Sequence, residues 1–242
     1  MVIAKAGEPA AFLSPPPEVR LVNAFERPYE NSVATARTCY SSRGIITAEE
    51  VAGVGEGEEV RAKRAESRDR IARSIYQAGH HTTLQHASFQ FALSNVSRQF
   101  LWSFLHAHPF YNSEQVSQRY VEVKPGACVV PALEGEALDV YRRTTDGQME
   151  DYHRLQEALE RPVEAMVRRR FPRRAGSKRE ARDVGKKAQE AARYVLPVAT
   201  HAFLYHTVSG LTLLRYYRLC EQRDAVYQQY VGGTRYLVYL ER

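Results

Sequence analysis

Three short stretches alternate between apolar and polar residues in the way that is typical of strands. The first two are Val19–Phe25 (VRLVNAF) and His86–Val96 (HASFQFALSNV). The third, Val198–Val208, follows a Leu-Pro pair that ends the helix expected before it. A fourth extended segment is expected within Tyr111–Val123, which is polar and stops before a proline. The pattern therefore predicts a small sheet assembled from distant parts of the chain.

Apolar residues recur with helical spacing in the segments between these strands. Glycine and proline mark several of the boundaries, such as Gly79 after a strongly charged helix and Pro28 before an earlier one. The expected helices cover Tyr29–Tyr40, Glu58–Ala78, Ser97–Leu105, Glu136–Phe171, Lys178–Tyr194 and Leu211–Gln222. Helices and strands intermix without regular alternation, so we expect an α+β fold. It would be a single domain over residues 1–242, with a mixed sheet, packed helices and a helical part at 136–194.

Composition adds limits on where the protein works. The 242 residues are 44% hydrophobic and 26% charged, as in ordinary globular proteins. No stretch approaches the roughly 20 apolar residues of a membrane span, and the first residues do not read as a secretory signal. The three cysteines are far apart and form no disulfide framework. These features indicate a cytoplasmic protein that does not enter the membrane.

The positive charge is concentrated in one stretch. Residues 168–187 hold ten basic residues against two acidic ones, a local +8, whereas the whole chain carries +6. Such a stretch can follow nucleic-acid phosphates, but it lacks a series of interleaved aromatic residues. A solvated helical surface, or the lining of a pocket for a small anion, is the preferred interpretation, and nucleic acid is not expected as a partner.

Histidines gather between Gly79 and Tyr120, which contains five of the chain's eight. His106 and His108 have the spacing of a metal-binding pair in an extended segment, but no cluster of carboxylates or cysteines accompanies them. We therefore predict no metal site. The glycine-rich loops that commonly hold nucleotide phosphates are also missing from the sequence.

Four blocks in a fixed order carry a resemblance to a known family. They are GHHTTLQHASFQF, SRQFLWSFLHAHPFYNSEQVSQRYV, ARYVLP and TVSGLTLLRYYRLC. This order resembles the flavin-dependent thymidylate synthases, from about Val19 to about Tyr230. In that family an Arg-His-Arg tripeptide precedes a Ser-x-Arg-Tyr motif. Here the tripeptide position reads His106-Ala107-His108, and eight residues separate it from Ser117-Gln118-Arg119-Tyr120.

The resemblance implies a homotetramer that makes dTMP from dUMP. FAD would pass a hydride from NADPH to the methylene group taken from methylenetetrahydrofolate. The residues implied to bind dUMP or a related nucleotide are Gln115, Ser117, Arg119 and Arg193. Two guanidinium forks and a hydroxyl donor suit a phosphate dianion. Arg193 could instead be a cation that stabilises the end of its own helix.

On the flavin side the family's residues are only partly present. The residues implied to bind the cofactor are His80, Thr82, Gln85, His106, His108, Ser209 and Arg215. Gln85 replaces a family glutamate, and Leu211 stands where the family has a flavin-binding arginine. Histidines at the tripeptide can still hydrogen-bond to phosphate, with less reach than arginine.

The family's arginine that orients the uracil ring aligns with Cys220, and a thiol supplies neither its charge nor its fork. Arg218 or Arg223 could replace it, because each lies within a turn of Cys220 on a helix. Cys220 could also be a nucleophile or an inert thiol. The leading interpretation is a thymidylate synthase-like methyltransferase. The alternative is a diverged paralogue that binds a nucleotide but has lost or changed the flavin reaction.

Overall fold

The computed structural model describes residues 12–107 and 111–221, which form two compact units. Within the described residues, the first unit contains 12–18, 94–102 and 115–204. The second contains 19–93, 103–107, 111–114 and 205–221. The organisation of the whole chain as a single domain stays a prediction.

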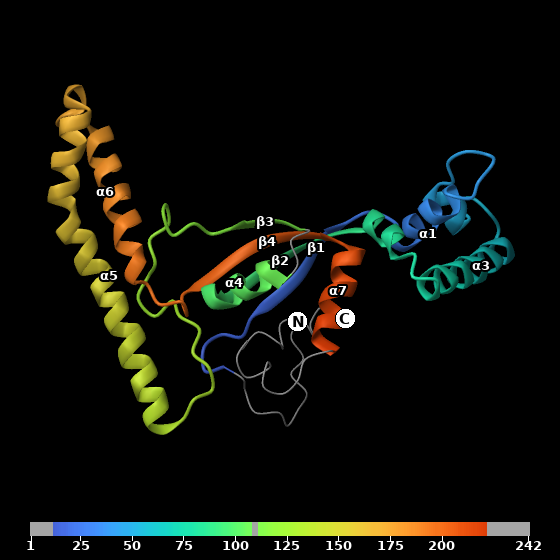
Figure 1. Ribbon diagram of the computed structural model, residues 1–242, viewed down its shortest axis with the longest axis horizontal. Helices are drawn as coiled ribbons and strands as arrows, with labels where there is room; N and C mark the ends of the chain where they lie inside the picture. The colour runs from blue at the N-terminus through green and yellow to red at the C-terminus, as the bar shows by residue number, and fades with distance from the viewer. Residues whose placement is uncertain (1–11, 108–110, 222–242) are drawn as a thin grey trace. The chain divides into compact units, whose positions relative to one another are not determined.

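Four strands form one sheet, in the order β1-β2-β4-β3 (Figure 1). They are β1 (Glu18–Ala24), β2 (Ser88–Ser97), β3 (Tyr111–Gln115) and β4 (His201–Ser209). Along β4 every second residue is buried, from Ala202 to Val208, which is the period of a strand with one face on the core. Along β2, Phe91 and Leu93 are buried at this period, and the alternation shifts at Asn95, whose φ is +56°, so that the next buried residue is Val96. The three expected strands are present, and within the segment Tyr111–Val123 only Tyr111–Gln115 forms a strand.

The first unit is dominated by a hairpin of two helices, α5 (Gly135–Arg170) and α6 (Lys178–Ala192), which lie side by side (Figure 1). Pro162 lies inside α5 without ending it. In the first turn of α6, buried Glu180 accepts hydrogen bonds from the backbone N–H of Gly176 and from Arg168 at the end of α5. The core beneath is formed by Val123, Cys128, Met149, Tyr152 and Ala192. The two helices predicted for this region are therefore confirmed.

The second unit contains the remaining helices and a 3-10 turn. They are α1 (Pro28–Thr38), α2 (Ala48–Ala52), α3 (Glu58–Gln77), η1 (His81–His86), the C-terminal half of α4 (Arg98–Ala107) and α7 (Gly210–Glu221). Val33, Ala34 and Val51 form a core, against which Ile46 and Ile71 pack. Gly79 ends the α3 segment with φ +76°, as its position predicted. The α+β class is confirmed.

Candidate functional site

Arg98 is the centre of a polar cluster in the first unit. It begins α4 directly after β2, and its side chain is half-buried. One of its terminal nitrogens donates to Gln115 Oε1 at 2.7 Å, and the other donates to the Val116 carbonyl. Burial, and then the charge of Arg193, lower the pKa of Arg98 below its ordinary value. An anion that binds beside Arg98 would stabilise its charged guanidinium, because this group is partly removed from water and lies close to a second cation.

Arg119 and Arg193 both contact Glu190 in the same unit. Arg119 lies in the turn after β3 and forms an ion pair with Glu190 on α6 at 2.6 Å. Lys187 pairs with the other oxygen of Glu190 at 2.9 Å, while Arg193 donates to the Glu190 carbonyl at 3.2 Å. The hydrogen bond from Lys187, with the charges of Arg119, Lys187 and Arg193, lowers the pKa of Glu190. We call Arg98, Arg119, Lys187, Glu190 and Arg193 the guanidinium cluster.

Two further contacts order the Ser-x-Arg-Tyr segment and join it to α6. The Ser117 hydroxyl accepts from the backbone N–H of Arg119 at 3.3 Å. Gln189, which is buried on α6, donates to the Gln118 carbonyl at 3.1 Å. The four residues expected to bind nucleotide, Gln115, Ser117, Arg119 and Arg193, therefore belong to one connected region.

In the second unit, three residues expected to bind cofactor line a polar pocket of about 620 Å³ at the start of α7. These are Gln85, Ser209 and Arg215. Ser209 accepts from the backbone N–H of Thr212 at 3.3 Å, which caps the first turn of the helix. We call this cavity the Arg215 pocket; its other lining residues are Ser88, Tyr111, Asn112, Thr207, Val208, Leu211 and Thr212.

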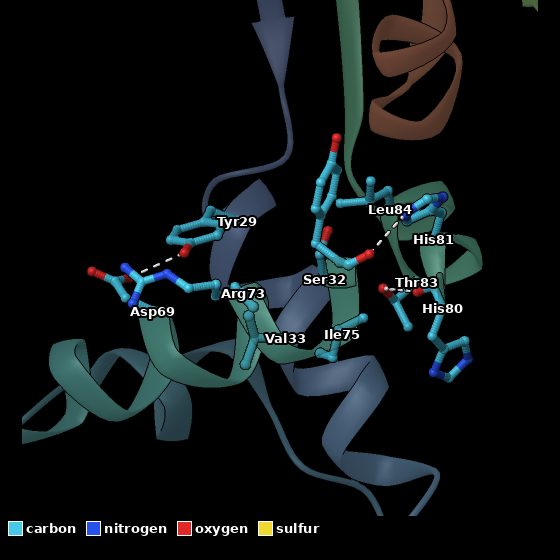
Figure 2. Close-up of a pocket in the computed structure, with 12 residues that line it drawn as sticks. Tyr29, Ser32, Val33, Asp69, Arg73, Ile75, His80, His81, Thr83 and Leu84 are labelled. Atoms are coloured by element: carbon cyan, nitrogen blue, oxygen red, sulfur yellow. Dashed lines mark hydrogen bonds between the residues drawn. The ribbon is translucent and has the colours of Figure 1, made fainter. Parts of the chain in front are cut away.

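A second cavity of about 450 Å³, the Tyr29 pocket, lies between α1, α3 and η1 (Figure 2). Figure 2 shows Tyr29 and His81 on opposite sides of the cavity. The Tyr29 hydroxyl donates to Asp69 at 3.1 Å, and His80, an expected cofactor residue, is part of the lining. The remaining lining residues are Ser32, Val33, Ala72, Arg73, Ile75, Tyr76, Thr83 and Leu84.

The other predicted residues are dispersed. Arg218 donates to the Tyr76 hydroxyl at 3.1 Å and lies over its ring, so it reaches a wall of the Tyr29 pocket. Thr82 is exposed and lines neither pocket, and His106 is exposed on the last turn of α4. Cys220 belongs to α7, but its side chain is outside the described part, as are His108 and Arg223 entirely.

The described residues contain no group of three or more His, Cys, Asp or Glu side chains arranged to hold a metal ion. In residues 12–107 and 111–221, no helix has the length and apolar character needed to cross a membrane.

Three residues of the guanidinium cluster, Arg98, Lys187 and Glu190, were not singled out from the sequence; Lys187 was noted only as the end of the basic stretch 168–187. The available signal for Arg98 was an arginine at the point where an apolar strand becomes an apolar helix, in NVSRQFLW. Glu190 gave no comparable signal, because a glutamate three residues before Arg193 on a helix is ordinary.

Comparisons with known proteins agree with the α+β fold. A family model described as "Thymidylate synthase complementing protein" matches residues 20–230. The chain belongs to the thymidylate synthase complementing protein family.

Similar proteins from several bacteria carry the name flavin-dependent thymidylate synthase. A protein of Clostridium tetani is 26% identical over 204 residues, which cover 83% of this chain and 73% of that protein. One from Mycobacteroides abscessus is 31% identical over 144 residues, 57% of this chain and about half (51%) of the relative. A solved UMP/dUMP methylase from Streptomyces cacaoi, bound with 5-Br dUMP, superposes with a TM-score of 0.54 at 18% identity, over 82% of this chain and 75% of that one. At that identity the likeness shows the fold.

Proposed function

We propose that the protein is an FAD-dependent thymidylate synthase that reductively methylates dUMP to dTMP, with methylenetetrahydrofolate and NADPH as co-substrates. The observation that carries this proposal is the guanidinium cluster. Arg119 and Lys187 form ion pairs with the carboxylate of Glu190, and Arg193 donates to the backbone carbonyl of the same residue. The charge of Arg193 in turn acts on the guanidinium of Arg98. The family of the chain and the cluster together support a nucleotide monophosphate as the ligand.

Within the cluster, the proposed roles follow from the contacts. Arg119 and Arg193 bind the phosphate of dUMP, and the Ser117 hydroxyl supplies a further donor. Arg98 holds the side chain of Gln115 and adds positive charge beside Arg193. Four cations against one carboxylate leave a net +3, which a phosphate dianion largely neutralises. In the protein without dUMP, the ion pair with Glu190 holds the guanidinium of Arg119 against α6. Binding of the dUMP phosphate would give this guanidinium a second anionic partner.

The Arg215 pocket has donors suited to the phosphates and ribityl chain of FAD. Its lining combines the guanidinium of Arg215, the amides of Gln85 and Asn112, and several hydroxyls. Leu211, which replaces a family arginine, is 6% exposed and supplies an apolar wall, while Arg215 supplies a cation one turn further along α7. The donor set therefore fits FAD. When bound, FAD supplies the capacity to accept and deliver a hydride.

The remaining flavin contacts are proposed from the family resemblance. His80 faces the Tyr29 pocket, whose aromatic walls suit a planar ring. Thr82, His106 and His108 are proposed to make further flavin contacts. Arg218 is proposed to compensate for the uracil-directed arginine that Cys220 replaces.

A homotetramer in the cytoplasm completes the proposal. Support for association comes from large apolar side chains exposed in the first unit. They are Trp102 (66% exposed), Tyr194 (81%), Val198 (64%) and Phe203 (59%). Light scattering of the eluted protein at several concentrations measures its mass directly, and a monomer at all of them would refute this part.

The test of the function is product analysis. Labelled dUMP is incubated with the FAD-loaded protein, NADPH and methylenetetrahydrofolate, with each component omitted in turn, and UMP is run in parallel. The proposal predicts labelled dTMP only in the complete mixture and its loss in Arg193→Ala, whereas Arg182→Ala, an exposed arginine on α6, retains activity. Tight binding of dUMP without formation of dTMP in any mixture would refute the proposal and favour a paralogue that binds a nucleotide without catalysis.

A further inference from the structure

Three hydrogen-bonded side chains, two buried and one partly buried, lie beside the Arg215 pocket in the second unit. His206, in the middle of β4, is 2% exposed. Its Nδ1 is hydrogen-bonded to the Ser113 hydroxyl on β3, and its Nε2 lies 3.3 Å from the Tyr216 hydroxyl on α7. One imidazole thus connects three elements that are distant in sequence.

Aromatic rings surround the same imidazole. The ring of Phe104 on α4 lies 4.8 Å from it, that of Tyr111 on β3 lies 5.4 Å away, and that of Tyr216 lies 6.0 Å away. Phe104 and Tyr216 also contact each other at 4.9 Å between ring centroids. A polar ring enclosed in this way costs free energy to bury unless its nitrogens are paired, as both are here.

The protonation state of His206 limits which partners donate and which accept in its two hydrogen bonds. Burial lowers the pKa of His206 from 6.5 to about 4, so the ring is neutral at physiological pH. A neutral imidazole has one donor nitrogen and one acceptor nitrogen. One of the two hydroxyls must therefore donate to the ring and the other must accept from it, and the tautomer of the imidazole decides which.

The three elements joined by His206 are also three walls of the Arg215 pocket. Tyr111 and Asn112 come from β3, residues 207–209 come from β4, and Thr212 and Arg215 come from α7. We propose that His206 is a positioning residue that fastens β3 and α7 to β4 and thereby keeps the Arg215 pocket in its ligand-ready shape. Only the identity of the ligand, FAD, rests on the proposed function.

The consequence is a measurable effect on a site that His206 does not line. When one of the two hydrogen bonds to His206 is removed, the walls of the Arg215 pocket open in part of the molecules. The apparent affinity of the pocket for its ligand then falls in proportion to the fraction of molecules that keep the binding shape. A neutral hydrogen bond of ordinary strength corresponds to about a ten-fold change, since about 1.4 kcal/mol is a factor of ten.

Hydrogen–deuterium exchange of the full-length protein tests the fastening without any ligand. Ser113→Ala should raise exchange in the peptide over 111–115, and Tyr216→Phe should raise it in the peptide over 210–217. Ser113→Thr retains a hydroxyl and should restore protection. Tyr205→Phe is the matched control, because Tyr205 precedes His206 on β4 but is 54% exposed. Unchanged exchange in both variants, or an equal rise along the whole chain, would overturn the proposal.

Titration with FAD, followed by flavin fluorescence, tests the effect on the pocket. Ser113→Ala and Tyr216→Phe should each weaken binding about ten-fold, with Ser113→Thr and Tyr205→Phe close to the unaltered protein. An unchanged affinity for FAD in both Ser113→Ala and Tyr216→Phe would refute the proposed effect of His206 on the Arg215 pocket. If the unaltered protein binds no FAD, the proposed function fails, while the exchange result still decides whether His206 fastens β3 and α7.

Discussion

Removal of the His206 imidazole should change how stability depends on pH. In the folded protein, burial lowers the pKa of His206 to about 4, against 6.5 for an exposed histidine. Between these values the unfolded chain binds a proton that the folded chain does not, so the free energy of unfolding falls as pH falls from 6.5 to 4. The difference of about 2.5 pKa units corresponds to about 3 kcal/mol at pH 4 and to no penalty at pH 7.

The assay is urea unfolding of the unaltered protein and of His206→Phe at several pH values from 4 to 8. The variant loses two hydrogen bonds and is less stable at pH 7, but its decline toward pH 4 should be shallower by about 3 kcal/mol. His86→Gln, which removes an exposed imidazole of the same unit, is the matched control. Parallel curves for His206→Phe and the unaltered protein would refute the claim that this ring is buried and neutral.

Three further substitutions test other parts of the structure. Arg119→Ala should weaken dUMP binding by about 10- to 150-fold in calorimetry, because a hydrogen bond to a charged group contributes about 1.5–3 kcal/mol; equal affinity in Arg119→Ala and the α6 control Arg182→Ala would remove Arg119 from the phosphate site. Cys220→Arg should increase dUMP-dependent oxidation of reduced flavin, and an unchanged rate would show that this position does not face uracil. Gly53→Ala should destabilise the protein by about 1–2 kcal/mol in urea unfolding, because φ is +70° and the added Cβ would lie 2.8 Å from Arg64 Cδ; an equally stable variant would contradict this geometry.

Local pattern predicted most of the secondary structure because each element has a clear period or boundary. The alternation of β4 and the long apolar stripe of α5 are of this kind. The prediction missed α2, Ala48–Ala52, whose five residues are too few to show a period and which depends on the capping box of Thr47 and Glu50. It also extended the second strand to His86, where η1 turns the chain before β2 begins at Ser88.

The candidate site was predictable to the extent that its residues fall in recognisable blocks. Ser117 and Arg119 are only two positions apart in the sequence, so one motif contains both. The contact of Arg98 with Gln115 joins the start of α4 to the end of β3, and no local pattern encodes such a pairing. The same holds for His206, whose neighbour Thr207 lines the pocket while the imidazole points to the buried side and binds Ser113 and Tyr216.

The most direct test of the proposed function is an absorbance spectrum. Purified protein is mixed with excess FAD, freed of unbound cofactor and then titrated with dUMP, with Arg119→Ala treated in the same way. The proposal predicts a retained flavin band that dUMP shifts in the unaltered protein and shifts only at much higher concentration in Arg119→Ala. A colourless protein that still binds dUMP would contradict flavin-dependent catalysis by this chain.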